Sequence, residues 1–533
     1  MNPRRGASLL SLTVTGLLAG TAAAEDPATV TISCGAGPGE RQHCRANTAS
    51  GILLARSTGP GACLLGRSWG YDDAGVWVQD GCSAEFIVAA AGTPAPVATA
   101  AVPAAPAAAA ATAAAAPVPA AAAFPAPDVV RQAAPANETW GYLDPGKGFL
   151  VGKTDVGELS ISAYALVRYM NQMADNDTFT DHLGRERPVD GRQDIYSHRV
   201  MVWLNGWLGN PKFRYTITSW TVNTTDQDAL FANIGYQFDP KFNLYAGVFG
   251  NSGSRSLLGS HPYWLGHDRV MADEFFRPFF TQGLYANGEI APGLWYAAGM
   301  GNTNSTLGTT AVELDRKFTY SGSMWWMPTT GEFGPRGAYG DWEHHEDLAT
   351  RFGFSFVDSP EQRFEDVGNA PGNTSLKLAD GVNVFETGAL VPGVTVTELD
   401  YRGAAVDLGM KYKGFFLQTE FYYRWLDNFR ADGFLPMTDV EDWGFYVQGS
   451  FYPIPRKLEV YAATSQIYGD DSLGFGDSSD YILGMNYYPF NTRNHRVNLQ
   501  YINVNKSPVG SVFGYYTTGQ DGDTVSLATS IFF

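Results

Sequence analysis

The feature that most restricts the fold of this chain is an alternation of apolar and polar residues through residues 441–533. It recurs in the segments 442–452, 457–467, 494–505 and 524–533, with aromatic residues near the segment ends. A two-residue period is that of a β-strand with one apolar face. A bilayer offers no partners to backbone N–H and C=O groups, so strands that cross it must close into a barrel. The pattern predicts an all-β fold, an antiparallel transmembrane β-barrel of the outer-membrane type.

Composition argues against a helical membrane protein. Only 17% of the 533 residues are charged, yet no run of eighteen apolar residues occurs, and that is about the length a spanning helix needs. Near the start, Arg4 and Arg5 precede an apolar run over 7–19, and small residues at 22–24 offer a cleavage site. We interpret residues 1–24 as a secretory signal peptide. A helical anchor is the alternative, but the run is too short to span.

All four cysteines of the chain lie before residue 90. They are Cys34, Cys44, Cys63 and Cys82. An even number in a small exported segment predicts two disulfides, and three pairings are open. Zinc binding is the alternative, and the segment lacks the C-x-x-C pair typical of it. Residues 25–90 are therefore expected to form a small β domain whose core needs this covalent support.

The small domain carries the pattern W-G-Y-x-x-x-G-V-W-V-x-x-G-C-x-A-E-F, which starts at Trp69. This pattern resembles an uncharacterised four-cysteine domain family of exported bacterial proteins. Trp69, Tyr71 and Trp77 are candidates for stacking on sugar rings, and peptidoglycan is the expected partner. The alternative is that these rings pack a small β core.

Residues 91–137 consist largely of Ala, Pro, Val and Thr. Recurrent prolines interrupt any helix, so a semi-rigid, partly extended linker is predicted. At ~3.1 Å per residue its reach is at most about 140 Å.

Residues 138–533 are predicted to form the barrel. Sixteen strands are expected, near 159–169, 198–208, 212–222, 229–238, 241–250, 281–290, 293–302, 316–327, 349–357, 398–412, 414–425, 442–452, 457–467, 479–488, 494–505 and 524–533. Tight turns such as Lys413-Gly414 alternate with long polar loops, as in bacterial barrels. With an even number of strands, the first strand starts and the last strand finishes on the same, periplasmic side of the membrane. The N-terminal domain is therefore predicted to be periplasmic. A soluble β-sandwich is the alternative.

Four segments of the barrel, 235–250, 378–388, 412–422 and 444–452, resemble the phosphate-selective porin O and P family. The resemblance extends over roughly residues 140–533. It implies a sixteen-stranded, homotrimeric, passive channel with one loop folded into its lumen.

The loop 251–278 follows the fifth predicted strand, the position of the inward-folding loop in such porins. Charges on a constriction loop set ion preference in a narrow pore. The candidates on this loop are Arg255, His261, His267, Arg269, Asp273, Glu274 and Arg277. The alternative is that some of them are solvated or fixed to the barrel wall. The strand period puts further charged residues on the lumen side: Arg168, Arg199, Arg214, Glu420, Arg424, Lys457, Glu459 and Arg496.

The formal net charge of -18 argues against a nucleic-acid partner. From Glu138 onward, 29 basic and 46 acidic residues give -17, so the negative charge belongs to the barrel. Two acidic clusters are expected in outer loops, solvated or bridged by cations to lipopolysaccharide. They comprise Asp432, Asp439, Glu441 and Asp442, and Asp470, Asp471, Asp477 and Asp480.

The resulting hypothesis is an outer-membrane porin, embedded in lipid, that passes small hydrophilic solutes or anions such as phosphate. A general or cation-preferring porin that tethers the membrane to peptidoglycan is the alternative, and an outer-membrane enzyme is a further one. No cofactor or metal site is predicted: Gly141–Lys147 only imitates a phosphate-binding loop, and Glu343–Glu346 is expected to be a solvated turn.

Overall fold

The structure is a computed structural model that describes residues 29–46, 52–59, 61, 63, 68–72, 74–89, 148–223, 227–259, 261–304, 317–372, 376–510 and 514–533. The chain divides into two compact units, Met1–Pro125 and Ala126–Phe533. The predicted signal peptide (1–24), linker (91–137) and Gly141–Lys147 loop lie outside the described residues.

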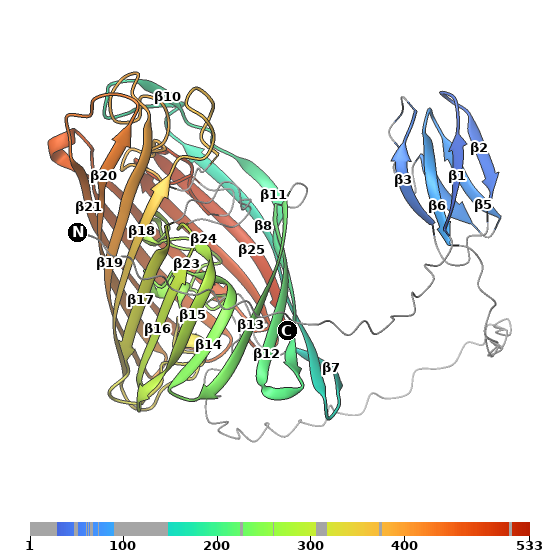
Figure 1. Cartoon of the computed structure of the whole chain (residues 1–533). Coiled ribbons are helices and arrows are strands. Elements are labelled where there is room, and N and C mark those ends of the chain that lie inside the picture. The colour runs from blue at the N-terminus through green and yellow to red at the C-terminus, as the bar shows by residue number, and fades with distance from the viewer. Residues whose placement is uncertain are drawn as a thin grey trace, which may run out of the picture. The chain divides into compact units, whose positions relative to one another are not determined.

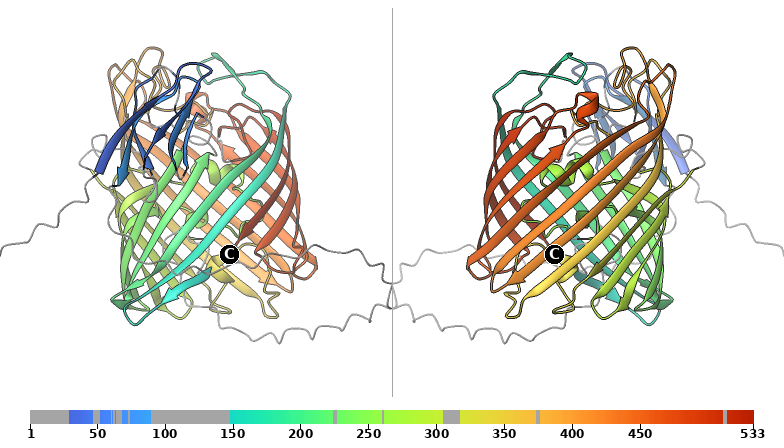
Figure 2. Two further views of the ribbon diagram at one scale, coloured as in Figure 1. Left: turned by 90° about the vertical axis from the view of Figure 1, so that its right-hand side faces the viewer. Right: turned by 90° about the vertical axis from the view of Figure 1, so that its left-hand side faces the viewer.

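The second unit is a closed antiparallel barrel of sixteen strands, β8 and β11 to β25 (Figure 1). Its strands are β8 (Gly157–Ala174), β11 (Gln193–Leu208), β12 (Asn210–Asn223), β13 (Gln227–Asp239), β14 (Phe242–Gly250), β15 (Phe280–Ala291), β16 (Leu294–Gly301), β17 (Thr319–Trp326), β18 (Ala349–Gln362), β19 (Val396–Tyr412), β20 (Phe415–Ala431), β21 (Asp439–Ile454), β22 (Leu458–Tyr468), β23 (Ser478–Tyr487), β24 (His495–Asn505) and β25 (Gly522–Phe532). Each pairs with the next along the chain, and β25 pairs with β8 to close the sheet. Figure 2 shows tilted strands on both sides of the barrel.

The sixteen predicted strands are confirmed, although several run beyond their predicted ends. β20 continues to Ala431, and β18 to Gln362. Three short strands were not predicted: β7 (Phe149–Lys153), which pairs with the start of β8, and the hairpin of β9 (Thr178–Thr180) and β10 (Glu186–Pro188). The rings of Phe149 and Phe533 lie 4.7 Å apart, so β7 is held where β25 ends.

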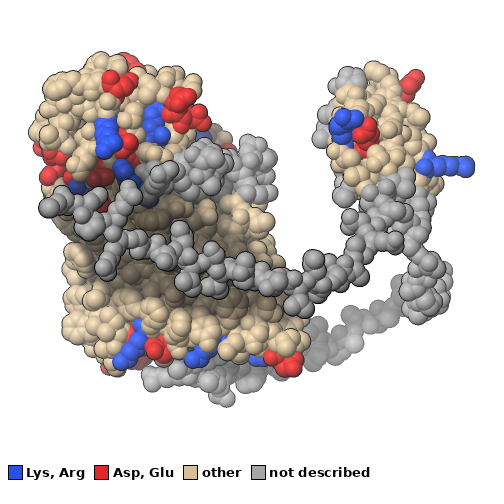
Figure 3. Space-filling model, viewed as in Figure 1, with Lys and Arg blue, Asp and Glu red and all other residues tan. Residues whose placement is uncertain are grey.

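Side chains alternate between an apolar outer surface and a buried interior, as the sequence period predicts. On β20, Phe415, Leu417 and Phe421 are 56%, 45% and 43% exposed, whereas Phe416 and Glu420 between them are buried. Charged residues gather at the two ends of the barrel on the face shown in Figure 3, and a tan band separates them. An apolar band between polar ends is the outer surface of an outer-membrane barrel. Among the described residues, no helix has the length and apolarity to cross a bilayer.

The two ends of the barrel differ in their connections. One end, here the short-turn end, carries turns such as Lys413-Gly414 between β19 and β20, whose φ angles are 48° and 86°. Positive φ at both central residues suits a two-residue hairpin, and glycine adopts it without a steric penalty. The opposite end, here the long-loop end, carries the longer connections.

One connection departs from the predicted alternation of short turns and long loops. Residues 327–348, between β17 and β18, lie at the short-turn end and form a long segment with a 3-10 turn, η2 (Pro335–Gly337). Phe333 and Tyr339 of this segment are buried in the same apolar cluster as residues of β20 and β21. We call this segment the lower plug. It bends into the barrel because its aromatic side chains find an apolar partner only there.

The first unit contains two three-stranded sheets that share one small core. One sheet has the order β1-β6-β3 and the other β2-β5-β4. The strands are β1 (Thr29–Gly35), β2 (Arg41–Arg45), β3 (Ile52–Ser57), β4 (Trp69–Asp72), β5 (Gly75–Gln79) and β6 (Ser83–Ala89). Strand β2 was not predicted, since its residues are mostly exposed and polar.

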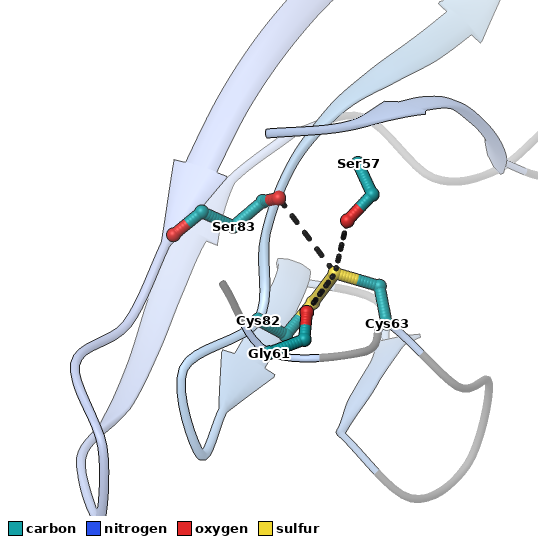
Figure 4. Close-up of a disulfide and its surroundings, with 5 residues drawn as sticks. All are labelled: Ser57, Gly61, Cys63, Cys82 and Ser83. Atoms are coloured by element: carbon teal, nitrogen blue, oxygen red, sulfur yellow. Dashed lines mark hydrogen bonds between the residues drawn. A yellow bond between two sulfur atoms is a disulfide. The ribbon is translucent and has the colours of Figure 1, made fainter. Parts of the chain in front are cut away.

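Two disulfides join strands and turns of this unit, as predicted, and they resolve the open pairing as Cys34–Cys44 and Cys63–Cys82. Figure 4 shows the second disulfide and its surroundings. The hydroxyl of Ser57 donates a hydrogen bond to Sγ of Cys63 at 3.5 Å. The disulfide thereby fixes the segment that contains Cys63 to the start of β6.

Candidate functional site

The connection from β14 to β15 folds into the barrel. It contains a 3-10 turn, η1 (Arg255–Leu257), and a short helix, α1 (Met271–Phe276), which contacts β20, β21 and β22. Further along the wall, the amide of Met271 donates to Oδ2 of Asp480 on β23 at 3.1 Å. We call residues 251–278 the lumen loop. Its position agrees with the inward-folding loop that the family resemblance implies.

The carboxylate of Asp268 fixes the lumen loop to β8 and β11. Arg168 on β8 donates from Nη1 to Asp268 Oδ2 at 2.7 Å, and Arg199 on β11 donates from Nη2 to Oδ1 at 2.8 Å. Burial alone would raise the pKa of Asp268, but the neighbouring Arg199, His198 and Arg168 hold it well below its ordinary value. Two guanidinium groups therefore meet on one carboxylate of the lumen loop.

A β-bulge brings a further residue to Asp268. The register of β11 against β8 shifts between Ser197 and Arg199, so the adjacent residues His198 and Arg199 are both buried. His198 Nε2 lies 3.3 Å from Asp268 Oδ2. Strict alternation places His198 on the outer surface, so sequence reasoning missed it. It also missed Asp268, whose only signal was its place between His267 and Arg269.

The second half of the lumen loop holds a compact charge network. Arg277 donates to both oxygens of Glu274, at 3.0 and 2.8 Å, and Ser256 donates to Asp273 Oδ1 at 2.9 Å. Arg269 donates from Nε to Ser256 Oγ at 2.8 Å. These charges are fixed within the loop and against the wall rather than solvated.

Arg255 links the lumen loop to the lower plug. Its amide donates to Glu420 Oε1 at 2.9 Å, and its Nη2 donates to the Gly337 carbonyl at 2.8 Å. The guanidinium also lies over the Tyr339 ring, 4.3 Å from its centroid. The amide of Tyr339 in turn donates to the Tyr263 carbonyl at 2.8 Å. Two segments that enter the barrel from opposite ends are therefore joined inside it.

The remaining candidates on the barrel wall have different surroundings. Arg496 donates to the carbonyls of Trp264 and Gly266, and Arg424 pairs with Asp442, both buried. His267 Nε2 lies 2.9 Å from Ser530 Oγ. Three predicted lumen residues remain. Glu459 is buried, whereas Arg214 on β12 and Lys457 in the turn after β21 are half-buried and lie towards the short-turn end.

Two expectations about acidic and histidine residues are wrong. Asp442 and Asp480 are fully buried and paired inside the barrel, rather than solvated in outer loops, because they bind Arg424 and the amide of Met271. His345 is also buried rather than part of a solvated turn, and its ring contacts Asp341 and Glu332.

The cluster around His345 belongs to the lower plug. Burial alone would lower the pKa of His345, but the hydrogen bonds that its ring donates to the carboxylates of Asp341 and Glu332 raise it to about 9. Ligand atoms of Asp341, Glu343 and His345 lie within 4.8 Å of one another. Since both ring nitrogens of His345 already contact carboxylates, we interpret the cluster as an ionic clasp for the plug.

The structure separates the three aromatic candidates of the first unit. Trp69 is buried in the core, where its ring lies 4.9 Å from that of Phe86. Tyr71 is 46% exposed. Trp77 is half-buried on the other face of its sheet, with the Arg41 guanidinium 4.3 Å above its ring.

Residues 379–511 match the family of phosphate-selective porins O and P, which confirms that part of the resemblance. Residues 31–121 match a family described as protein of unknown function (DUF3011). None of the curated proteins matches the chain.

Solved outer-membrane structures are similar to the barrel at low identity. OmpT of Vibrio cholerae is 12% identical, with a TM-score of 0.45 over 72% of this chain and 99% of that chain. The channel DcaP of Acinetobacter baumannii is 10% identical, with a TM-score of 0.42 over 73% and 100%. An anion-selective porin from Comamonas acidovorans is 10% identical, with a TM-score of 0.42 over 71% and 100%.

The chain is therefore an outer-membrane-type β-barrel of sixteen strands whose residues 379–511 match the phosphate-selective porin O and P family, preceded by a small β domain with two disulfides that matches DUF3011.

Proposed function

We propose that the barrel is a passive channel that prefers small hydrophilic anions and works as a homotrimer. The supporting observation is the meeting of two guanidinium groups, those of Arg168 and Arg199, on Asp268, where the lumen loop contacts β8 and β11. The proposal that the channel is a homotrimer is based on the family resemblance. A pore lined by fixed positive charge concentrates anions and repels cations.

The pKa values of two buried histidines of the lumen loop reflect the positive charge of the arginines beside them. Burial lowers the pKa of His261 well below its ordinary value, and Arg199, Arg336 and Arg269 lower it further. Burial and Arg496 do the same to the pKa of His267. Both rings are therefore neutral at pH 7, so the positive charge around them comes from arginine and does not vary with pH in the physiological range. The net charge of -17 from residue 138 onward does not describe this local field, since it sums every charged residue of that part of the chain.

The test is the reversal potential of the purified protein in a planar bilayer under a KCl gradient. The wild type is expected to show anion preference. Arg269→Gln is expected to lower the anion-to-cation permeability ratio by roughly fivefold, the factor given by about 1 kcal/mol for unit charges ~4 Å apart in water. Arg430→Gln makes the same change on a side chain that is 71% exposed, and should leave the ratio unchanged. Cation preference of the wild type contradicts the proposal.

We further propose that the first unit is periplasmic and binds peptidoglycan, which makes the chain a link between membrane and cell wall. The outer face of β2 and β5 supports this. Arg41 and His43 pair with Gln79 and Trp77 across these strands, so their side chains share one face. The Trp77 ring lies against Gly70 of β4, where a side chain would not fit. A guanidinium group beside an indole suits a polymer of sugar rings and carboxylates.

The binding test is co-sedimentation of the full-length protein with purified peptidoglycan. Trp77→Ala is expected to weaken binding at least about tenfold, as loss of an aromatic anchor commonly does. Tyr71→Ala, on the opposite face, is the matched control and should bind as the wild type does. Equal binding by both variants, or no binding by the wild type, rejects this role.

A further inference from the structure

A cavity lies between the lumen loop and the wall formed by β11, β12 and the start of β15. About 40 Å³ of it is open to the centres of water-sized molecules, more than the roughly 10–15 Å³ that one water needs. It has two kinds of lining. Met201, Leu257, Trp220 and Phe280 are apolar, whereas Arg199, Ser256, His261 and Arg269 are polar, and Trp264 completes the wall.

The hydrogen bonding of His261 shows which kind of ligand group the polar side of the cavity favours. Nε2 of His261 lies 3.4 Å from Nη1 of Arg199. A guanidinium can only donate, so Nε2 is the acceptor and the neutral ring carries its proton on Nδ1. His261 is 6% exposed, and its Nδ1 is buried without a hydrogen-bond partner in the part of the chain that the structure describes. A buried donor without an acceptor costs about 1–3 kcal/mol, so this position favours an acceptor from a ligand.

The charge around the cavity requires that acceptor to be anionic. Arg269 lies with its guanidinium 4.3 Å over the Trp264 ring, which holds it in place, and only 9% of its side chain is exposed. Asp268 is shared between Arg199 and Arg168, and Asp273 lies 3.7 Å from Arg269. Carboxylates thus stand behind the guanidinium groups, but none is among the residues that line the cavity.

We infer that this cavity is a binding site for small monocarboxylates, in which the carboxylate meets Arg199, His261 and Arg269 and the alkyl group meets the apolar wall. Inorganic phosphate fits less well. Its four oxygens all need donors, and those turned towards Met201, Trp220 and Phe280 would find none. A carboxylate places both oxygens on one side and its carbon atoms on the other. The inference deepens the proposed anion channel by naming a class of solute.

The test is isothermal titration of the full-length protein in detergent with acetate, propionate, butyrate and inorganic phosphate at constant ionic strength. We expect saturable carboxylate binding that phosphate does not displace. From acetate to propionate the affinity should rise about fourfold, the factor given by ~0.8 kcal/mol for one buried methylene, and then level off because the cavity is small. Saturable binding of phosphate at equal or higher affinity overturns the inference, as does carboxylate binding that is indifferent to chain length.

Arg269→Gln should reduce carboxylate affinity at least about tenfold, as loss of a charge-assisted hydrogen bond of ~1.5–3 kcal/mol does, while Arg430→Gln should not. If Arg269→Gln does not fold, the titrations of the wild type with acetate, propionate and butyrate still test the inference. Reversal potentials separate this inference from the proposed function. An anion-selective channel with no saturable carboxylate binding rejects the site alone, and carboxylate binding without anion selectivity rejects the channel preference alone.

Discussion

Asp268→Asn is expected to lower the free energy of unfolding of the barrel by about 3–5 kcal/mol, the usual cost of removing one partner from a buried ion pair. Its carboxylate accepts from Arg168 and Arg199 at 2.7 and 2.8 Å, and all three side chains are buried. An amide accepts fewer charged hydrogen bonds and removes the negative charge that both guanidinium groups contact. Urea unfolding of the full-length protein in lipid vesicles, followed by tryptophan fluorescence, measures the change.

Asp155→Asn is the matched control for this substitution. Asp155 is exposed in the turn between β7 and β8, so a change of less than about 0.5 kcal/mol is expected. The lumen loop should also become less tightly held in Asp268→Asn, which would appear as noisier single-channel current. An unchanged free energy of unfolding would show that Asp268 does not fix the loop to β8 and β11.

The second large effect is expected in the first unit. Removing the Cys63–Cys82 disulfide by Cys63→Ser with Cys82→Ser should cost about 2–5 kcal/mol, which often abolishes the folding of a small exported domain. Limited proteolysis of the full-length protein, with mass spectrometry of the cleavage sites, should show new cuts within residues 29–89.

Ser57→Ala is the control for the disulfide, because it removes only the 3.5 Å hydrogen bond to Cys63 Sγ. The barrel forms a separate compact unit, so its heat-modifiable mobility on gels should remain that of the wild type in both variants. Protection of residues 29–89 in the double serine variant would mean that the core around Val76, Val78 and Phe86 suffices without this bond.

The outer surface of the barrel was readable in the sequence, because lipid imposes the same condition on every strand. Each residue that faces the bilayer must be apolar and its neighbours must point inward, so the register of a strand such as β20 follows from its own residues. The two disulfides were predictable for a similar reason, since four cysteines in one small segment leave few alternatives. Their pairing was not, because it depends on how β1, β2 and β6 come together.

The interior of the barrel was decided only by the tertiary structure. Asp268 meets Arg168 across 100 positions of sequence, and Arg255 meets Gly337 across 82. The bulge at His198 reverses the direction in which that residue points, and the lower plug enters from an end where short turns were expected. Water and lipid act on each strand separately, so the sequence by itself determined a closed barrel of sixteen strands and a disulfide-bonded β domain. Charge pairing inside the lumen acts between distant segments, so the folded chain alone decided which arginines hold the lumen loop and which line the cavity beside it.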